Sequence, residues 1–184
     1  MRAEQTSLQD CYIIHDNLII DDRGFFFESF NEQKFANVTG LNVHFVQDNQ
    51  SRSKKGVLRG LHYQKGNHSQ AKLVRVLRGK VLDVAVDLRK SSPTFSQTFS
   101  IVLTETSNTQ LFLPRGFAHG FVVLSETADF FYKCDNFYSK ESDAGINYND
   151  TNLNIDWQIE STEMIISEKD KLLPFFDINE TIFE

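Results

Sequence analysis

The stretch AKLVRVLRGKVLDVAVDL, residues 71–88, alternates small groups of apolar and polar side chains around an Arg78-Gly79 pair. Alternation with a period of two is typical of β-strands, and it predicts strands over residues 71–77 and 80–88. The Arg78-Gly79 pair predicts a tight hairpin turn between them. In the first strand Lys72 and Arg75 fall on opposite faces, so periodicity leaves open which cation enters a pocket. Asp83 can project inward from the second strand.

The rest of the chain extends this β-rich pattern. Strand-like segments of similar length follow at short intervals, with turn residues between them, which is typical of a sandwich or closed double sheet. We therefore expect one all-β domain over residues 1–184, with a few short peripheral helices. Two helices are expected, at 31–36 with Asn31 as the cap and at 167–171 ahead of Pro174. Further strands are expected at 43–48, 99–103, 109–113, 121–124 and 128–133, two short ones within 11–20, and a polar loop at 50–56.

Composition narrows the class of protein. Apolar residues make up 40% of the 184 residues and charged residues 24%, which indicates a globular chain. The net charge of −6 disfavours a nucleic-acid binder, which needs a basic surface, but it is compatible with a local basic pocket. No segment resembles a signal peptide or a membrane span. The two cysteines, Cys11 and Cys134, lie far apart without a Cys-x-x-Cys spacing, so we expect a cytoplasmic protein with free thiols.

The segment GVLRGLHYQ, residues 56–64, places Arg59 and His62 in an apolar, strand-like run. Burying such groups is costly unless they are paired or face a wet cavity, so the run predicts a pocket wall. Three positions apart, the two side chains would point to opposite faces of a regular strand. Glycine within a strand often marks a bulge, and Gly60 is the expected break. His119 lies in a similar setting in LPRGFAHGF, residues 113–121.

These residue types suit proton abstraction next to a carbonyl group. Histidine exchanges protons near neutral pH, and a neighbouring carboxylate fixes its tautomer. Lysine or arginine stabilises a developing oxyanion, and a tyrosine such as Tyr132 can donate a proton to the enolate carbon. The structural alternatives are that His62 and Tyr132 serve the core, that Arg23 and Glu28 are ordinary turn and cap residues, and that Asp170 is a surface charge at a helix end.

Six blocks of sequence, in order, resemble the dTDP-4-dehydrorhamnose 3,5-epimerase family. The blocks are residues 22–30, 45–51, 56–64, 70–76, 114–120 and 131–134, with further matches at 149–150 and 155–157. The resemblance implies a cupin-type jelly roll that forms a homodimer by exchanging strands. It implies inversion of dTDP-4-keto-6-deoxy-glucose at C3 and C5 without a metal or other cofactor, and no nucleic-acid or membrane partner.

The resemblance also implies roles for individual residues. His62 is similar to the general base and Asp170 to the carboxylate that orients it, with Asp83 as a rival for that position. Tyr132 is similar to the acid, and Lys72 to the residue that stabilises the C4 oxyanion. Implied substrate contacts are Arg59 and His119 near the oxyanion, Arg23, Glu28, Gln47, Asp48, Asn49 and Lys169 on the nucleotide sugar, Tyr138 stacked on thymine, and Asp143.

One segment departs from the family pattern, and three other functions stay open. The chain has Asp143-Ala144-Gly145-Ile146 where the family usually has Glu-Arg-Gly-Ile, so the shorter Asp143 puts that substrate contact in doubt. A mono-epimerase acting at C3 or C5 alone would use the same residues. A metal-dependent cupin enzyme is a rival, but it usually has a His-x-His pair, which this chain lacks. A non-catalytic sugar-nucleotide binding protein is the third alternative.

Overall fold

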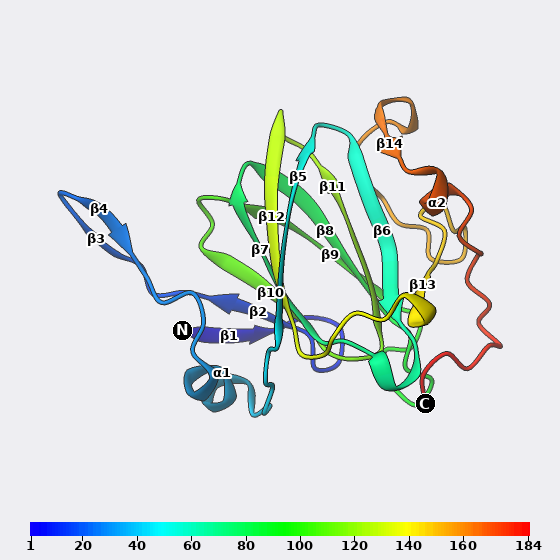
Figure 1. Ribbon diagram of the computed structural model, residues 1–184, viewed down its shortest axis with the longest axis horizontal. Coiled ribbons are helices and arrows are strands. Elements are labelled where there is room, and N and C mark those ends of the chain that lie inside the picture. Colours follow the sequence, from blue (N-terminus) through cyan, green and yellow to red (C-terminus); the bar gives the residue numbers. More distant parts are fainter.

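The computed structural model describes residues 1–184 and consists mainly of two antiparallel sheets packed face to face (Figure 1). This is the all-β, jelly-roll architecture expected from the sequence. In the order of their pairing, the first sheet contains β1 (Arg2–Gln5), β2 (Tyr12–His15), β10 (Thr109–Leu113), β7 (Lys72–Arg78), β12 (Thr127–Cys134) and β5 (Gln47–Lys54). The second contains β13 (Asp143–Gly145), β6 (Val57–Gln64), β11 (Phe117–Val123), β8 (Lys80–Asp87) and β9 (Thr98–Thr104).

Three apolar clusters explain why so many strands are buried on both faces. The largest lies between the sheets and includes Val74, Leu111 and Phe130 from the first sheet and Ala85 and Phe121 from the second. A second cluster lies on the outer face of the second sheet, where the C-terminal part of the chain covers it. The third lies on the outer face of the first sheet, under the helix α1 (Glu32–Thr39). Burial of this apolar surface is the main term that favours folding.

Both expected helices are present, and the first begins at its predicted cap. The Asn31 side chain accepts a hydrogen bond from the Lys34 amide, 3.0 Å away, at the start of α1. Ser167 does the same for the Asp170 amide, 3.1 Å away, at the start of α2 (Glu168–Lys171). The remaining short elements are 3-10 turns at Gly66–His68, Lys140–Ser142 and Ser161–Glu163 and the strand β14 (Ile165–Ile166), which pairs with β6. None of the helices is long and apolar enough to span a membrane.

Two sequence predictions were wrong for identifiable reasons, and a third missed the start of a strand. Arg78-Gly79 does not close a hairpin, because β7 and β8 belong to different sheets and the turn carries the chain from one to the other. The polar segment 50–56 is not a loop, because most of it belongs to β5, which begins at Gln47 rather than at residue 43. As an edge strand that pairs only with β12, β5 needs no apolar side chains on its exposed face. β11 also begins earlier than predicted, at Phe117.

One segment projects away from both sheets. The strands β3 (Ile19–Asp21) and β4 (Gly24–Phe26) form a separate hairpin at the far left of Figure 1. We call residues 18–28 the arm. Its apolar side chains are uncovered, with Ile20 74% and Phe26 68% exposed. Exposed groups of apolar side chains of this kind mark interaction surfaces.

Candidate active site

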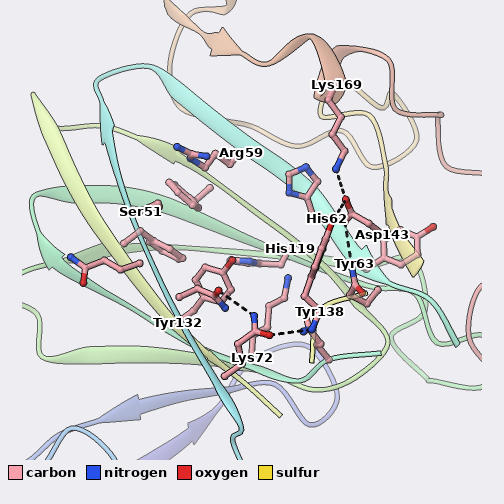
Figure 2. A pocket seen from close by; sticks show the side chains of 17 residues that line it. Ser51, Arg59, His62, Tyr63, Lys72, His119, Tyr132, Tyr138, Asp143 and Lys169 are labelled. Atoms are coloured by element: carbon pink, nitrogen blue, oxygen red, sulfur yellow. Dashed lines mark hydrogen bonds and ion pairs between the residues drawn. The ribbon is translucent and has the colours of Figure 1, made fainter. Parts of the chain in front are cut away.

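A cavity of about 500 Å³ opens between the two sheets and is lined by polar side chains from both (Figure 2). One wall, formed by β6 and β11, contributes Arg59, His62 and His119. The opposite wall, formed by β7 and β12, contributes Lys72 and Tyr132. We call these the histidine wall and the lysine–tyrosine wall.

A bulge in β6 brings Arg59 and His62 to the same cavity. His119 on β11 pairs with His62 on β6, and Phe121 on β11 pairs with Arg59 on β6. The same stretch of the ladder therefore spans three residues on β6 and two on β11. Gly60 lies within this bulge at φ 135°, which is accessible to glycine but unfavourable for other residues. A Cβ at Gly60 would also lie 2.5 Å from the Gly120 Cα. The predicted break in strand alternation at Gly60 is therefore confirmed.

His62 is held by a buried carboxylate from α2. Its Nε2 lies 2.8 Å from Oδ1 of Asp170, whose side chain is only 5% exposed. Burial alone would raise the pKa of Asp170, but the hydrogen bond and charge of His62 and the Gly60 amide lower it below its ordinary value. An ionised carboxylate only accepts hydrogen bonds, so Nε2 is the protonated nitrogen and Nδ1 of the neutral ring is free to accept a proton.

The rival carboxylate, Asp83, contacts the other histidine. Both of its oxygens lie within hydrogen-bond distance of His119 Nε2, at 3.0 and 3.1 Å, and its side chain is fully buried. The His119 ring also stacks on Phe130, with centroids 5.9 Å apart. Of the two carboxylates that the sequence left open, Asp170 is thus the one that touches His62. No group of three or more His, Cys, Asp or Glu side chains is arranged to hold a metal ion.

The lysine–tyrosine wall contains groups whose polar ends face the cavity. The Lys72 Nζ lies 5.9 Å from the centre of the Tyr132 ring. Burial lowers the pKa of Lys72 and raises the pKa of Tyr132, because it penalises the ammonium and the phenolate alike. Arg75, the other cation of β7, points to the outer face, where its guanidinium lies 4.7 Å from the Phe27 ring. The structure therefore places Lys72 rather than Arg75 in the cavity.

A hydrogen-bonded group of side chains forms one end of the cavity. The Asp143 carboxylate accepts hydrogen bonds from the Tyr138 hydroxyl, at 3.2 Å, and from the Lys169 ammonium. Gln47 donates to Asn49 at 3.1 Å and accepts from the Tyr138 amide at 3.1 Å. All five of these residues line the cavity.

Three of the expected contact residues do not line the cavity of their own chain. Asp48 alternates with Gln47 and Asn49 along β5, so its carboxylate points outward, 2.9 Å from the Lys133 ammonium. Arg23 belongs to the arm, where its side chain is 90% exposed and paired with Asp21. Glu28 ends the arm and pairs with Lys34 at 2.8 Å.

Sequence reasoning missed several cavity residues, of which Gln64 is the most informative. Its side chain is buried, donates to Asp143 at 3.4 Å and accepts from the Ser139 amide at 2.8 Å. The available signal was its position two residues after His62, on the same face of β6. Ser51, Gln70, Phe121 and Phe130 also line the cavity without having been predicted.

The sequence matches the family model described as dTDP-4-dehydrorhamnose 3,5-epimerase over residues 5–177. The chain belongs to this family. The epimerase of Escherichia coli K12 is 47% identical over 182 residues, which cover 99% of this chain and 97% of the relative. The solved structure of the epimerase from Elizabethkingia anophelis NUHP1 is 57% identical, with a TM-score of 0.93 and 96% of each chain covered.

A second epimerase structure was solved with a sugar nucleotide. It is the dTDP-6-deoxy-D-glucose-3,5-epimerase of Legionella pneumophila Philadelphia 1, in complex with dTDP-4-keto-L-rhamnose. It is 44% identical to this chain, has a TM-score of 0.88, and the match covers 96% of this chain and 98% of that one. Membership of the family, and the similarity of the fold over nearly its whole length, agree with the resemblance found in the sequence.

Proposed function

We propose that this epimerase inverts C3 and C5 of dTDP-4-keto-6-deoxy-glucose, without a cofactor, to give dTDP-4-keto-rhamnose. The observation that carries the proposal is the placement of the His62–Asp170 pair and Tyr132 on opposite walls of one cavity. A sugar ring bound between the walls would present one face to a base and the other face to an acid. The relatives' names and the sugar nucleotide bound by the Legionella pneumophila enzyme support this substrate class.

The proposed reaction begins with proton abstraction by His62. The 4-keto group acidifies the hydrogens on both flanking carbons, C3 and C5. Nδ1 of His62 takes one of these protons, and the electron pair of the broken C–H bond moves onto the C4 oxygen to form an enolate. The Lys72 ammonium stabilises that oxyanion, with Arg59 and His119 beside it.

Inversion requires that the proton returns from the other wall. Tyr132 donates its phenolic proton to the opposite face of the enolate carbon, and the carbonyl re-forms as the new C–H bond is made. Burial raises the pKa of Tyr132, which keeps the phenol protonated near neutral pH. Each inversion leaves His62 protonated and Tyr132 deprotonated, and exchange with water restores both. Solvent hydrogen must therefore enter the product at each inverted carbon.

The nucleotide is proposed to occupy the end of the cavity around Tyr138. An exposed tyrosine ring offers a stacking surface for thymine, and Tyr138 is 53% exposed. Gln47 and Asn49 offer amide groups, and Lys169 offers a cation for the diphosphate. The cavity lining contains the cations Arg59, Lys72 and Lys169 against the single carboxylate of Asp143, and this local positive charge within a chain of net charge −6 suits an anionic ligand.

We also propose a homodimer in which the arm of each chain reaches the cavity of the other. Support comes from the uncovered apolar side chains of the arm and from Arg23 and Glu28, which do not line the cavity of their own chain. Replacing Phe25 and Phe26 by serine is expected to shift the protein from dimer to monomer in sedimentation velocity. A wild-type protein that sediments as a monomer would contradict the proposal.

The buried free thiols of Cys11 and Cys134 support a cytoplasmic location.

The direct test of the function is incubation with dTDP-4-keto-6-deoxy-glucose in deuterated water, followed by NMR of the sugar. The proposal predicts deuterium at both C3 and C5, with inversion at both carbons. Inversion at one carbon alone would identify a mono-epimerase. Binding of dTDP without any exchange would identify a binding protein, and activity that depends on a stoichiometric metal would favour the metal-dependent cupin class.

A further inference from the structure

Asp143 joins the nucleotide end of the cavity to the helix that carries Asp170. One carboxylate oxygen, Oδ2, receives hydrogen bonds from both the Tyr138 hydroxyl and the Lys169 ammonium. The other oxygen, Oδ1, lies 3.4 Å from the Gln64 amide nitrogen. The Asp143 side chain is 17% exposed, whereas that of Lys169 is 62% exposed, so the carboxylate is held in place while its ion pair is open to solvent on the lysine side.

Lys169 is the residue directly before Asp170 on α2. Because α2 has only four residues, it is too short to be stable alone and depends on its contacts with the rest of the chain. Asn147 binds the carbonyl oxygens of Lys171 and Leu173, each at 3.2 Å, and so fixes the C-terminal end. The Lys169–Asp143 ion pair links the body of α2 to β13.

The same helix holds the proposed base. Asp170 lies 2.8 Å from His62, and β13 pairs with β6 so that Gly145 is opposite His62 and Asp143 is opposite Gln64. Asp143 lies two residues from Gly145, which is opposite His62, and its ion-pair partner Lys169 lies one residue from Asp170. A change at Asp143 can therefore affect the His62–Asp170 pair from both sides. Figure 2 shows Lys169, Asp143 and Tyr138 connected in series beside His62.

We propose that Asp143 is a positioning residue that couples nucleotide binding to the orientation of His62. Through Lys169 it holds α2, so that Asp170 keeps its hydrogen bond to His62. Through its hydrogen bond from the Tyr138 hydroxyl, Asp143 is also linked to a nucleobase that stacks on the Tyr138 ring. A bound thymidine diphosphate group restricts Tyr138, which strengthens the series of contacts from Tyr138 to α2 and orders the His62–Asp170 pair. This inference rests on the proposed function, since it assigns the nucleotide to the Tyr138 end.

The expected consequence is that nucleotide binding energy contributes to the chemical step as well as to affinity. A residue that only contacts the substrate would change KM alone, whereas a positioning residue also lowers kcat. Asp143→Asn keeps the shape of the side chain but removes the charge that holds Lys169. Asp143→Glu keeps the charge and has the length that is usual in the family.

The test compares Asp143→Asn, Asp143→Glu and the control Glu168→Gln. Glu168 forms a lysine–carboxylate pair on the same helix, with Lys171, but its side chain is 85% exposed and does not line the cavity. We expect Asp143→Asn to lower kcat about 10- to 100-fold, as small displacements of catalytic groups do. Asp143→Glu should recover most of this loss, and Glu168→Gln should leave kcat unchanged.

A second measurement reads the His62–Asp170 pair without turnover. The hydrogen on His62 Nε2, bonded to a carboxylate, is expected to give a downfield proton resonance, which the variant His62→Asn assigns by its loss. In the wild-type protein, saturating dTDP should sharpen this resonance, and in Asp143→Asn it should be broad with or without dTDP. Asp143→Asn with a raised KM, an unchanged kcat and a wild-type resonance would overturn the inference. Failure of the proposed function would instead appear as a wild-type enzyme without turnover.

Discussion

The two walls of the cavity differ in how their polar groups are satisfied. On the histidine wall, His62 and His119 are each hydrogen-bonded to a buried carboxylate, Asp170 and Asp83. On the lysine–tyrosine wall, the ends of Lys72 and Tyr132 face the cavity without a side-chain hydrogen bond or ion pair, and the ammonium lies 5.9 Å from the centre of the ring.

The histidine side chains are therefore oriented before a ligand binds, whereas Lys72 and Tyr132 gain their polar partners from the ligand. A histidine held by a carboxylate has a defined tautomer and is ready to accept a proton. A buried ammonium and phenol without carboxylate partners have shifted pKa values and gain most from an oxyanion placed between them. We therefore expect the histidine wall to control proton removal. We expect the lysine–tyrosine wall to stabilise the negative charge of the enolate and to return the proton.

The largest expected effect comes from removing the base of the histidine wall. His62→Ala should lower kcat by about 10³-fold or more, since general base catalysis contributes about 10²- to 10⁴-fold. It should also abolish exchange of the C3 and C5 hydrogens with solvent deuterium. Steady-state kinetics and NMR in deuterated water measure the two effects.

A matched control for this variant is His15→Ala. His15 is also bonded to a carboxylate, Glu4, at 3.1 Å, but on β2 outside the cavity. It should leave kcat within about twofold of the wild-type value, as surface substitutions usually do. Near-normal exchange in His62→Ala would contradict the assignment of the base to the histidine wall, because another group would then remove the proton.

A smaller effect is expected from the lysine–tyrosine wall when pH changes. Burial lowers the pKa of Lys72, so its positive charge is present below that pKa and is lost as the pH rises through it. Burial raises the pKa of Tyr132, so the phenol keeps its proton to a higher pH than an exposed tyrosine does. We therefore expect kcat to fall on the alkaline side because the oxyanion loses its cation.

Lys72→Met should lower kcat about 10²- to 10³-fold.

The variant Lys72→Arg identifies the group that titrates. A guanidinium stays charged across the accessible pH range, so the alkaline fall in kcat should move to higher pH in this variant. The profile of kcat against pH, measured for wild type and variant, checks the expectation. An unchanged alkaline fall in Lys72→Arg would assign it to another group and remove Lys72 from the account of this wall.

The fold was largely predictable from local patterns, and the failures have a physical cause. Alternation located most strands, the side-chain cap at Asn31 located the first helix, and the segment ahead of Pro174 located the second. The turn at Gly79 was predictable, but its role was not, because a tight turn looks the same whether the next strand pairs with the last or crosses to the other sheet. Most of β5 was assigned to a loop because its pocket face is polar and its other face is exposed.

The candidate site was predictable in its residue types but not in its pairings. His62, Arg59 and the break at Gly60 followed from one short segment. The choice between Asp170 and Asp83 did not, because His62 and Asp170 are 108 positions apart and only the tertiary fold brings them together. Asp48 was expected in the site from the resemblance to the family, whereas strand alternation turns its side chain outward.

The central claim, that base and acid act from opposite walls, is tested most directly with Tyr132→Phe. This variant loses the phenolic hydroxyl and keeps the ring, and it leaves His62 and Asp170 untouched. Incubated with dTDP-4-keto-6-deoxy-glucose in deuterated water, it should still exchange hydrogen with solvent but should lose inversion at C5. Full turnover with inversion at both carbons would contradict the assignment of the acid to the lysine–tyrosine wall.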